Sequence, residues 1–296
     1  MGIVNVTQNL WSHPLAQNQR TATFGRFLRW QIGSRILDAP VAMPYIENTR
    51  LLVETGMSGA TGNIYFGLHE YESMSFVLHT LRKNHSFIDV GANVGSYTVL
   101  AAGVVGCSCV SIEPVPLNYQ HLRDNVRLNN LESRTNLHNA AAGSKSGVLH
   151  LKAEGTPYDR VLDDAEEEEK RIKVSVLTLD SIVPEKKSVL VVKVDVEGWE
   201  TEVLNGAEKI LQRKNPTALI VELDGAGRKY GFDDSKKHLD LIDAGFTPVW
   251  YAPQDHDLYP VEEWKPSGNT IYVNNRNIFE TLTKESRKYS FYEKQI

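Results

Sequence analysis

Long apolar segments and cysteines are both scarce in this chain of 296 residues. No run of about 18 apolar residues occurs, so no transmembrane helix is expected. The first residues lack the basic flank and the continuous apolar core of a secretory signal. The two cysteines, Cys107 and Cys109, lie in one strand-like run and cannot easily pair with each other. We therefore expect buried free thiols in a reducing compartment, the cytoplasm.

An excess of positive charge is missing as well. The formal net charge is -5 at pH 7, which argues against a general binder of nucleic acids or anionic membranes. Hydrophobic residues make up 41% of the chain and charged residues 23%, as in ordinary globular proteins. A chain of this length accommodates one large α/β domain with an appendage, or two small domains.

The dinucleotide fingerprint G-x-G-x-x-G is also absent. A strand-like run at 87–90 leads into the turn Gly91-Ala92-Asn93-Val94-Gly95, and Ser96 begins a helix-like segment. Asn93 stands where the second glycine would let the backbone approach a pyrophosphate, so NAD and FAD are disfavoured. Asp89, at the end of the strand, would repel a phosphate and attract an ammonium group. These features favour S-adenosylmethionine, which carries an ammonium group and no phosphate, over a plain strand-to-helix turn.

Two further strand ends carry groups suited to an adenosine. Glu113 ends the second strand-like run, where an acid can accept hydrogen bonds from both ribose hydroxyls. Asn139 and Ala140 lie in a third predicted strand, at about 136–142. Small residues there suit the border of an adenine ring, although a tightly packed strand end explains them equally well.

A continuous Val/Leu run at 188–194 predicts a central parallel strand that is buried on both faces. It ends in four charged residues, Lys193, Asp195, Glu197 and Glu200. Burying such charges is costly unless they are paired or used, so they are candidate catalytic residues. The alternative is a Lys193–carboxylate pair followed by acids at a helix N-terminus. The next buried strand, 218–224, also ends in acids, among them Glu222.

The remaining segments set the predicted domain limits. Residues 1–67 are expected to form an N-terminal extension, with a helical segment and a short hairpin of strands 51–54 and 63–67. Residues 148–151 and 172–176 predict an inserted hairpin around an acidic loop, 163–169, which we interpret as a solvated loop. The main domain then spans 68–275, and residues 276–296 form a basic tail.

These motifs together resemble the FkbM family of S-adenosylmethionine-dependent methyltransferases. The matching stretches are 87–97, 111–118, 178–182, 192–200 and 220–223, within roughly 68–275. The resemblance implies a class I methyltransferase fold, a Rossmann-like α/β domain. Its mostly parallel sheet would have seven strands, the last antiparallel, with helices on both faces.

The resemblance also implies roles for the residues above. It places Asp89, Gly91, Asn93 and Ser96 around the methionine part of the cofactor, with Glu70 nearby. Glu113 would bind the ribose, and Asn139 and Ala140 would border the adenine. Lys193, Asp195, Glu197 and Glu200 would line the methyl-transfer side.

The reaction implied is methyl transfer to a hydroxyl of a sugar, in a glycan or a glycosylated metabolite. Such a hydroxyl must lose its proton during the attack, and a carboxylate, preferably Asp195 or Glu197, can accept it. Alternatively, Asp195 and Glu222 hold a divalent cation, Mg²⁺ or Mn²⁺, that acidifies the hydroxyl. A non-sugar acceptor and a non-catalytic adenosyl-binding module are the competing functions, and the intact Asp89, Glu113 and Asp195 disfavour the module.

For partners, we expect a hydroxyl-bearing acceptor, no nucleic acid, and a second copy of the chain that binds through the N-terminal extension. The acceptor pocket is expected to form from the N-terminal region, the 153–170 loop and the segment 251–266. Aromatic residues of that segment and its flank, Trp250, Tyr251, Tyr259 and Trp264, could stack on sugar rings.

Overall fold

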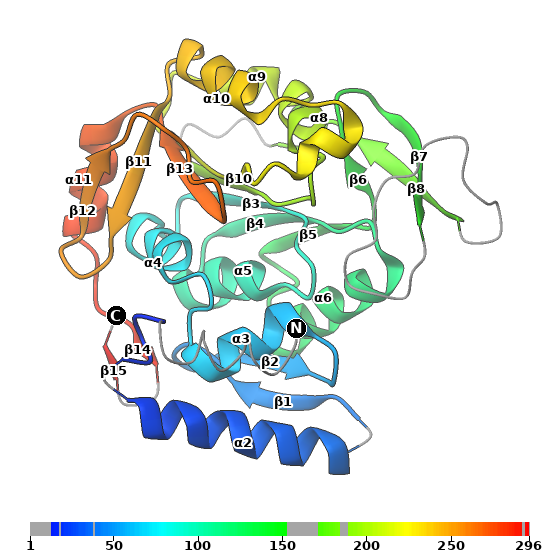
Figure 1. The fold of residues 1–296 in the computed structure, drawn as a ribbon, viewed down its shortest axis with the longest axis vertical. Coiled ribbons are helices and arrows are strands. Elements are labelled where there is room, and N and C mark those ends of the chain that lie inside the picture. The colour runs from blue at the N-terminus through cyan, green and yellow to red at the C-terminus, as the bar shows by residue number, and fades with distance from the viewer. Residues whose placement is uncertain are drawn as a thin grey trace.

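The computed structural model of the chain describes residues 13–17, 19–37, 39–152, 171–183, 189–291 and 294–295. A large twisted sheet runs through the molecule, with helices packed on both faces (Figure 1). In spatial order its strands are β12 (Asp257–Pro260), β11 (Thr247–Ala252), β13 (Asn269–Val273), β10 (Thr217–Glu222), β9 (Leu190–Val194), β3 (Ser86–Val90), β4 (Ser108–Ile112) and β5 (Thr135–His138).

The direction of these strands defines the fold class. Strands β10, β9, β3, β4 and β5 pair in parallel. β13 runs antiparallel to both of its neighbours, β10 and β11, so β11 points the same way as the parallel set. These seven strands confirm the predicted class I methyltransferase sheet. β12 adds an eighth, antiparallel strand at the edge, because the chain turns back on β11 as a hairpin.

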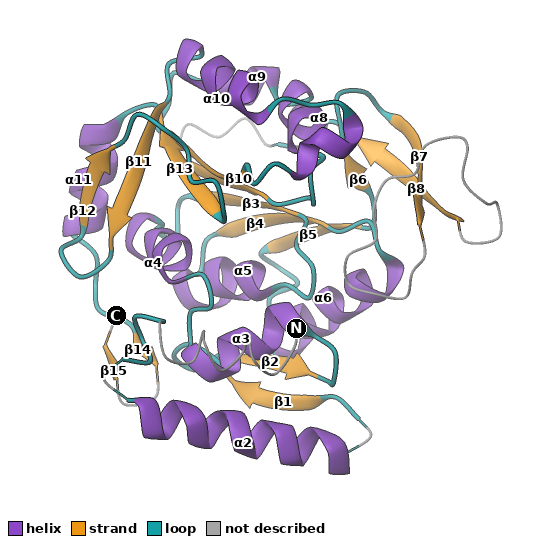
Figure 2. Ribbon diagram, in the orientation of Figure 1, coloured by secondary structure: helices purple, strands orange, loops and turns teal. Residues whose placement is uncertain are grey.

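Helices cover the two faces of the sheet separately (Figure 2). On one face lie α4 (Tyr71–Thr80), α5 (Ser96–Thr98) with its π-helical continuation Val99–Val105, and α6 (Pro116–Leu128). On the other face lie α8 (Glu200–Asn205), α9 (Glu208–Leu211) and α10 (Asp234–Asp243). The described part of the chain after β5 contains three more helical segments. The short helix α7 (Leu179–Ile182) contacts α9, and Ala226–Tyr230 forms a 3-10 turn. Helix α11 (Arg276–Lys284) packs on α4 and β12.

The central strands are apolar on both faces because both faces are covered. Successive side chains of a strand point to opposite sides, so Phe87 and Val191 join one buried cluster while Ile88 and Val192 join the other. This accounts for the continuous Val/Leu run of β9. Polar groups are confined mainly to the carboxyl ends of the strands, where they face the site described below.

The N-terminal extension packs against the first of these faces. Its helix α2 (Arg20–Ile36) contacts α3 (Ser58–Phe66), and its hairpin pairs β1 (Val41–Pro44) with β2 (Arg50–Val53). The hairpin predicted from 51–54 and 63–67 was therefore wrong in its second strand. Residues 63–66 complete α3, which ends at Gly67 with a positive φ of 93°. A short apolar run is compatible with either a strand or a helix. Residues 63–66 form a helix because neighbouring elements bury them from several sides.

Two smaller sheets complete the structure. β7 (Gly147–Lys152) and β8 (Arg171–Leu177) form the predicted inserted hairpin, and β6 (Ala141–Ala142) pairs with β8. The acidic loop at 163–169 lies outside the described residues. Near the C-terminus, β14 (Ser290–Phe291) pairs with β15 (Lys294–Gln295). The backbone N–H of Ser290 donates to the side-chain carboxylate of Glu47 in the extension, and the carbonyl group of Ser290 accepts from the backbone N–H of Glu47.

The cysteines have the predicted environment. Cys107 and Cys109 are buried and free. Among the described helices, none combines the length and the apolarity needed to cross a bilayer.

Candidate active site

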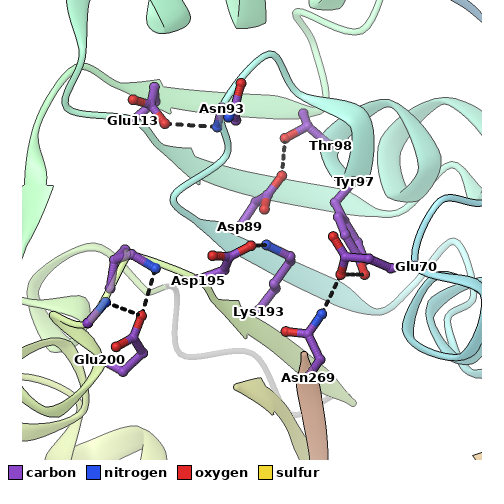
Figure 3. Close-up of polar contacts among 12 residues, drawn as sticks. Glu70, Asp89, Asn93, Tyr97, Thr98, Glu113, Lys193, Asp195, Glu200 and Asn269 are labelled. Atoms are coloured by element: carbon purple, nitrogen blue, oxygen red, sulfur yellow. Dashed lines mark hydrogen bonds and ion pairs between the residues drawn. The ribbon is translucent and has the colours of Figure 1, made fainter. Parts of the chain in front are cut away.

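The carboxyl ends of the parallel strands surround a cavity of about 330 Å³. Most of the residues predicted from the sequence line this cavity: Glu70, Asp89, Gly91, Asn93, Ser96, Glu113, Lys193, Asp195, Glu197 and Glu222. Because parallel strands bring their carboxyl ends to one edge of the sheet, side chains more than 100 positions apart in the sequence meet here (Figure 3).

The glycine-rich turn after β3 has a conformation that its residues make accessible. Gly91, Asn93 and Gly95 all have positive φ, at 76°, 50° and 90°, a region open to glycine and tolerated by asparagine. A Cβ atom on Gly91 would lie 1.8 Å from the carbonyl oxygen of Asp195. The turn can therefore pass close to the chain that leaves β9 only if glycine occupies this position.

Glu113 binds the same turn from the end of β4. Its carboxylate accepts hydrogen bonds from the backbone N–H groups of Asn93 (2.8 Å) and Val115 (2.9 Å). Burial raises the pKa of Glu113 to about 7, although these two hydrogen bonds counteract the shift. The Asn118 side chain is a third hydrogen-bond partner. A carboxylate has about four acceptor sites, so Glu113 can still accept a hydrogen bond from a ribose.

Affinity for S-adenosylmethionine is accordingly expected to depend on pH. The ionised form of Glu113 accepts ribose hydroxyls better, and with a pKa of about 7 this form is lost as the pH falls. Calorimetric titration should give a Kd about tenfold higher at pH 6 than at pH 8. Glu113→Gln should bind more weakly and remove this part of the pH dependence. An equally steep pH dependence in Glu113→Gln would show that another group controls the affinity.

Asp89 lines the cavity and keeps one carboxylate oxygen unpaired. It is 1% exposed, and its Oδ2 accepts a hydrogen bond from the Thr98 hydroxyl (2.7 Å), whereas Oδ1 has no partner within the protein. Burial raises the pKa of Asp89, and Lys193 opposes that shift. The buried hydroxyl of Ser96 also lacks a partner. An unpaired carboxylate oxygen and an unpaired hydroxyl fit the ammonium and carboxylate groups of a methionine moiety.

A buried ion pair lies next to Asp89. The Lys193 side chain is 4% exposed, and its Nζ lies 2.7 Å from Asp195 Oδ2 and 4.9 Å from the centre of the Tyr97 ring. Burial alone would lower the pKa of Lys193, but the carboxylates of Asp195, Glu70 and Asp89 together raise it. Lys193 therefore stays protonated, so it can attract a carboxylate and cannot act as a base.

Glu222 shares a proton with Asp195. Burial, the charge of Asp195 and a hydrogen bond between the two carboxyl groups raise the pKa of Glu222 to about 9. The pKa of Asp195 is lowered despite its burial, because Lys193 and Glu222 stabilise its ionised form. At neutral pH Glu222 therefore donates its proton to an ionised Asp195.

Three of the predicted site residues do not line the cavity. Glu200 does not line the cavity: its carboxylate accepts hydrogen bonds from the N–H groups of Val196 and Gly198, and so braces the loop after β9. Asn139 turns its amide toward the carbonyl groups of Glu113 and Pro114. Neither Asn139 nor Ala140 lines the cavity, and the next two residues, Ala141 and Ala142, do so in their place.

The acids do not provide a metal site. Within the described ranges, no group of three His, Cys, Asp or Glu residues could hold a metal ion. Lys193 already places its ammonium group on Asp195, and the protonated Glu222 donates to the same carboxylate. Because Lys193 supplies the positive charge that a cation would bring, Asp195 and Glu222 do not fit the predicted Mg²⁺ or Mn²⁺ site.

Several residues of the cavity were missed in the sequence. Tyr97 and Trp199 both line it and lie inside the motifs quoted above, so the motifs could have revealed them. Asn269 lies at the start of β13 and donates a hydrogen bond to Glu70, to which Tyr97 also donates (2.8 Å). Nothing in the local sequence marks Asn269, since β13 joins the sheet from far along the chain.

A second cavity, of about 390 Å³, adjoins the first. His69, Glu70 and Glu222 line both cavities. The second one continues toward the tip of β13 and also contains Glu72, Lys265 and Asn269. Of the predicted acceptor segments, the N-terminal region contributes His13 and Pro14, and 251–266 contributes Lys265; 153–170 lies outside the described residues.

The aromatic residues predicted to stack on the acceptor do not line either cavity. Tyr251 is completely buried and contacts His79. Trp250 stacks on Tyr259 at the edge of the sheet, and Trp264 packs beside His238. Tyr251 and Trp264 are thus used in packing. Trp250 and Tyr259 remain 41% and 44% exposed, and Trp250 donates a hydrogen bond to Glu72 of the second cavity (3.1 Å).

The order of the strands, the glycine turn and the acidic strand tips define a class I methyltransferase. The sequence model of the Methyltransferase FkbM domain matches residues 89–248, more than half of the chain. This chain therefore belongs to the FkbM methyltransferase family and is an S-adenosylmethionine-dependent methyltransferase.

Comparison with proteins of curated function found no match. Among solved structures, a putative methyltransferase from Streptococcus mutans in complex with SAH is 12% identical, with a TM-score of 0.39, over 68% of this chain and 94% of that one. An rRNA methylase from Streptococcus thermophilus is 12% identical, with a TM-score of 0.38, over 68% and 92%. A SAM-dependent O-methyltransferase from Thermotoga maritima is 12% identical, with a TM-score of 0.37, over 70% and 64%. These likenesses are too distant to bear on the acceptor.

Proposed function

We propose that the protein transfers a methyl group from S-adenosylmethionine to a hydroxyl of a sugar, in a glycan or a glycosylated metabolite. The observation that carries this proposal is the second cavity, which meets the cofactor cavity at Glu70 and Glu222. The methionine end of the cofactor cavity lies at β3 and β9, and the second cavity begins at the neighbouring tips of β10 and β13. An acceptor there would reach the methyl group from the side of Glu222.

The side chains around the second cavity suit a neutral acceptor rich in hydroxyl groups. They include the amide of Asn269, the hydroxyls of Ser73 and Ser267, and several carboxyl groups. Among the described residues that line it, the only lysine or arginine is Lys265, and Glu72 pairs with it. A phosphate or carboxylate acceptor would need an unpaired cation, so a sugar fits better than an anionic metabolite.

The protonation states indicate how the acceptor loses its proton. When bound, S-adenosylmethionine supplies a methyl group on a positively charged sulfur. A positive charge in the cofactor cavity favours ionised Glu222, which can then accept the proton of the acceptor hydroxyl. Glu222 is a better base than Asp195, whose pKa is lowered. Asp195 holds Lys193 and Glu222 in position, and in-line alignment of oxygen, methyl and sulfur contributes much of the remaining rate.

The proposal can be tested by titrating S-adenosylmethionine calorimetrically and then assaying a panel of methyl glycosides for release of S-adenosylhomocysteine. Methylation of one or more glycosides, with anionic analogues of the same sugars inactive, would support it. Cofactor binding with turnover only on non-sugar acceptors would reject the sugar assignment. We further propose that the enzyme works in the cytoplasm, which its two free cysteines favour.

Removal of divalent metal should not affect this activity. Lys193 already neutralises Asp195, so we expect the same rate before and after dialysis against EDTA, within about twofold. The assay should include a sample to which Mg²⁺ and Mn²⁺ are added back. A large loss on chelation that either ion restores would contradict the assignment of Glu222 as the base.

A further inference from the structure

The helix α2 (Arg20–Ile36) is packed on one side only. Thr23, Phe27 and Trp30 are buried, and the Phe27 ring meets Tyr65 of α3 edge-on at 5.4 Å. Arg26 reinforces this contact by donating a hydrogen bond to the Tyr65 carbonyl group (3.0 Å). In Figure 1 the helix lies at the border of the molecule, outside the hairpin of β1 and β2. One side of α2 is therefore fixed to the protein, and the opposite side faces outward.

The outward side of α2 is apolar. Phe24, Leu28, Ile32 and Ile36 recur every four residues and are 49%, 42%, 61% and 74% exposed. At 3.6 residues per turn, these four positions cover an arc of about 120°. Leu37, which follows the helix, is also exposed. Twelve large apolar residues are exposed among the described residues, and five of them lie on α2 or directly after it. Such a concentration of exposed apolar side chains indicates an interaction surface.

The charge of this region is opposite to that of the rest of the chain. Residues 1–37 contain four arginines and no lysine, aspartate or glutamate, so they carry +4, whereas the whole chain carries -5. Arg29 and Arg35 are exposed. Arg35 follows Leu28 by two turns and Arg29 precedes Ile32 by three residues, so both lie along the apolar ridge. Within α2 itself, the charged residues beside the ridge are all cations; the first acid after the helix is Asp38.

From this combination we propose that α2 docks on the surface of a membrane rich in anionic phospholipids. An apolar arc flanked by arginines lies in the plane of the interface, with its side chains among the acyl chains and its cations at the headgroups. A second copy of the chain fits this face less well. A symmetric contact would bring the arginines of both copies together, and α2 carries no acid to pair with them. The proposal does not depend on the acceptor of the methyl group.

Co-sedimentation of the full chain with vesicles tests the proposal. The vesicles would consist of phosphatidylcholine alone, or with one quarter of phosphatidylglycerol. At roughly 0.1 M salt we expect partition into the anionic vesicles to be about 25-fold stronger than into the neutral ones, because two arginines each contribute a factor of about five. Raising the salt to about 0.5 M should remove most of this difference.

Two matched variants separate the apolar ridge from general surface hydrophobicity. Ile32→Glu should weaken binding to anionic vesicles about tenfold or more. Leu239→Glu, at a 58% exposed position on α10, should leave it unchanged. Both variants should retain the unfolding temperature and the cofactor affinity of the parent. Equal binding to the two vesicle types, or full binding by Ile32→Glu, would overturn the proposal. A dimer in light scattering that Ile32→Glu dissociates, without vesicle binding by the parent, would assign the face to a second copy instead.

Discussion

Asn in place of Asp89 is expected to raise the Kd for S-adenosylmethionine about 100-fold. The substitution keeps the shape of the side chain and its contact with Thr98. It removes the charge from a side chain that lines the cavity and keeps one oxygen unpaired. A hydrogen bond between charged groups contributes about 1.5–3 kcal/mol, and 3 kcal/mol corresponds to a factor of about 100. Calorimetric titration measures the effect directly and does not require the acceptor.

Asp224→Asn is the matched control for this measurement. Asp224 is an exposed acid just beyond the tip of β10, and it does not line the cavity. Its substitution removes one negative charge from the same edge of the sheet without removing a contact to the cofactor. If Asp89 acts through direct contact, the affinity of Asp224→Asn for S-adenosylmethionine should therefore change less than twofold. Equal weakening in the two variants would show that only the overall acidity of the edge matters. Unchanged affinity in Asp89→Asn would reject the cofactor site.

Glu222→Gln is expected to lower kcat by a factor of about 10²–10⁴, with the Kd for S-adenosylmethionine changed less than threefold. The amide can still donate a hydrogen bond to Asp195 but cannot accept the proton of the acceptor. In the parent, kcat should rise with pH until Glu222 is ionised, at about pH 9 in the free enzyme and lower with the positive cofactor bound. The measurement is a pH profile of kcat with an acceptor found in the glycoside panel.

Glu197→Gln distinguishes the proposed base from the one first expected. Glu197 is an exposed residue at the rim of the cofactor cavity, and partial desolvation there, followed by the charge of Asp195, raises its pKa. It does not line the second cavity, so we expect a much smaller loss of kcat than in Glu222→Gln. The reverse order of losses would transfer the role of base to Glu197. A pH profile that keeps its rise in Glu222→Gln would also exclude Glu222.

Asp195 and Lys193 form an ion pair, so a single substitution of either residue is a poor test of its role in catalysis. Lys193 is buried, although Asp195 is 25% exposed. Removing Asp195 would leave a buried uncompensated charge, at a cost of about 3–5 kcal/mol in stability. A loss of activity in either single variant would therefore mix unfolding with catalysis. Glu222 offers a cleaner test because Gln preserves both its size and its hydrogen bond to Asp195.

The sequence was sufficient to predict the central sheet and most of the cofactor cavity. Buried parallel strands need apolar side chains on both faces, so the runs before Asp89, Glu113 and Asp195 could be recognised as strands. The residues that follow such strands lie at one edge of the sheet whatever the details of packing. For this reason Asp89, Glu113, Lys193 and Asp195 could be assigned to one site before their distances were known.

Other features depended on contacts between distant segments. Glu200 was predicted to act in catalysis, yet the loop after β9 folds so that its carboxylate binds Val196 and Gly198. The segment 63–66 is apolar enough for a strand or a helix, and its packing between α2 and the domain decided for a helix. Asn269 reaches Glu70 only because β13 inserts beside β10.

By itself, then, the sequence determined the class of fold, the acidic edge of the sheet and the kind of cofactor, because the polarity of a strand and of the residues after it is a local property. The tertiary structure alone decided which carboxyl groups share a proton, which of them line both cavities, and which apolar face of α2 remains exposed. Proton affinity depends on burial and on charges a few ångströms away, and those distances arise only when strands far apart in the chain are placed side by side.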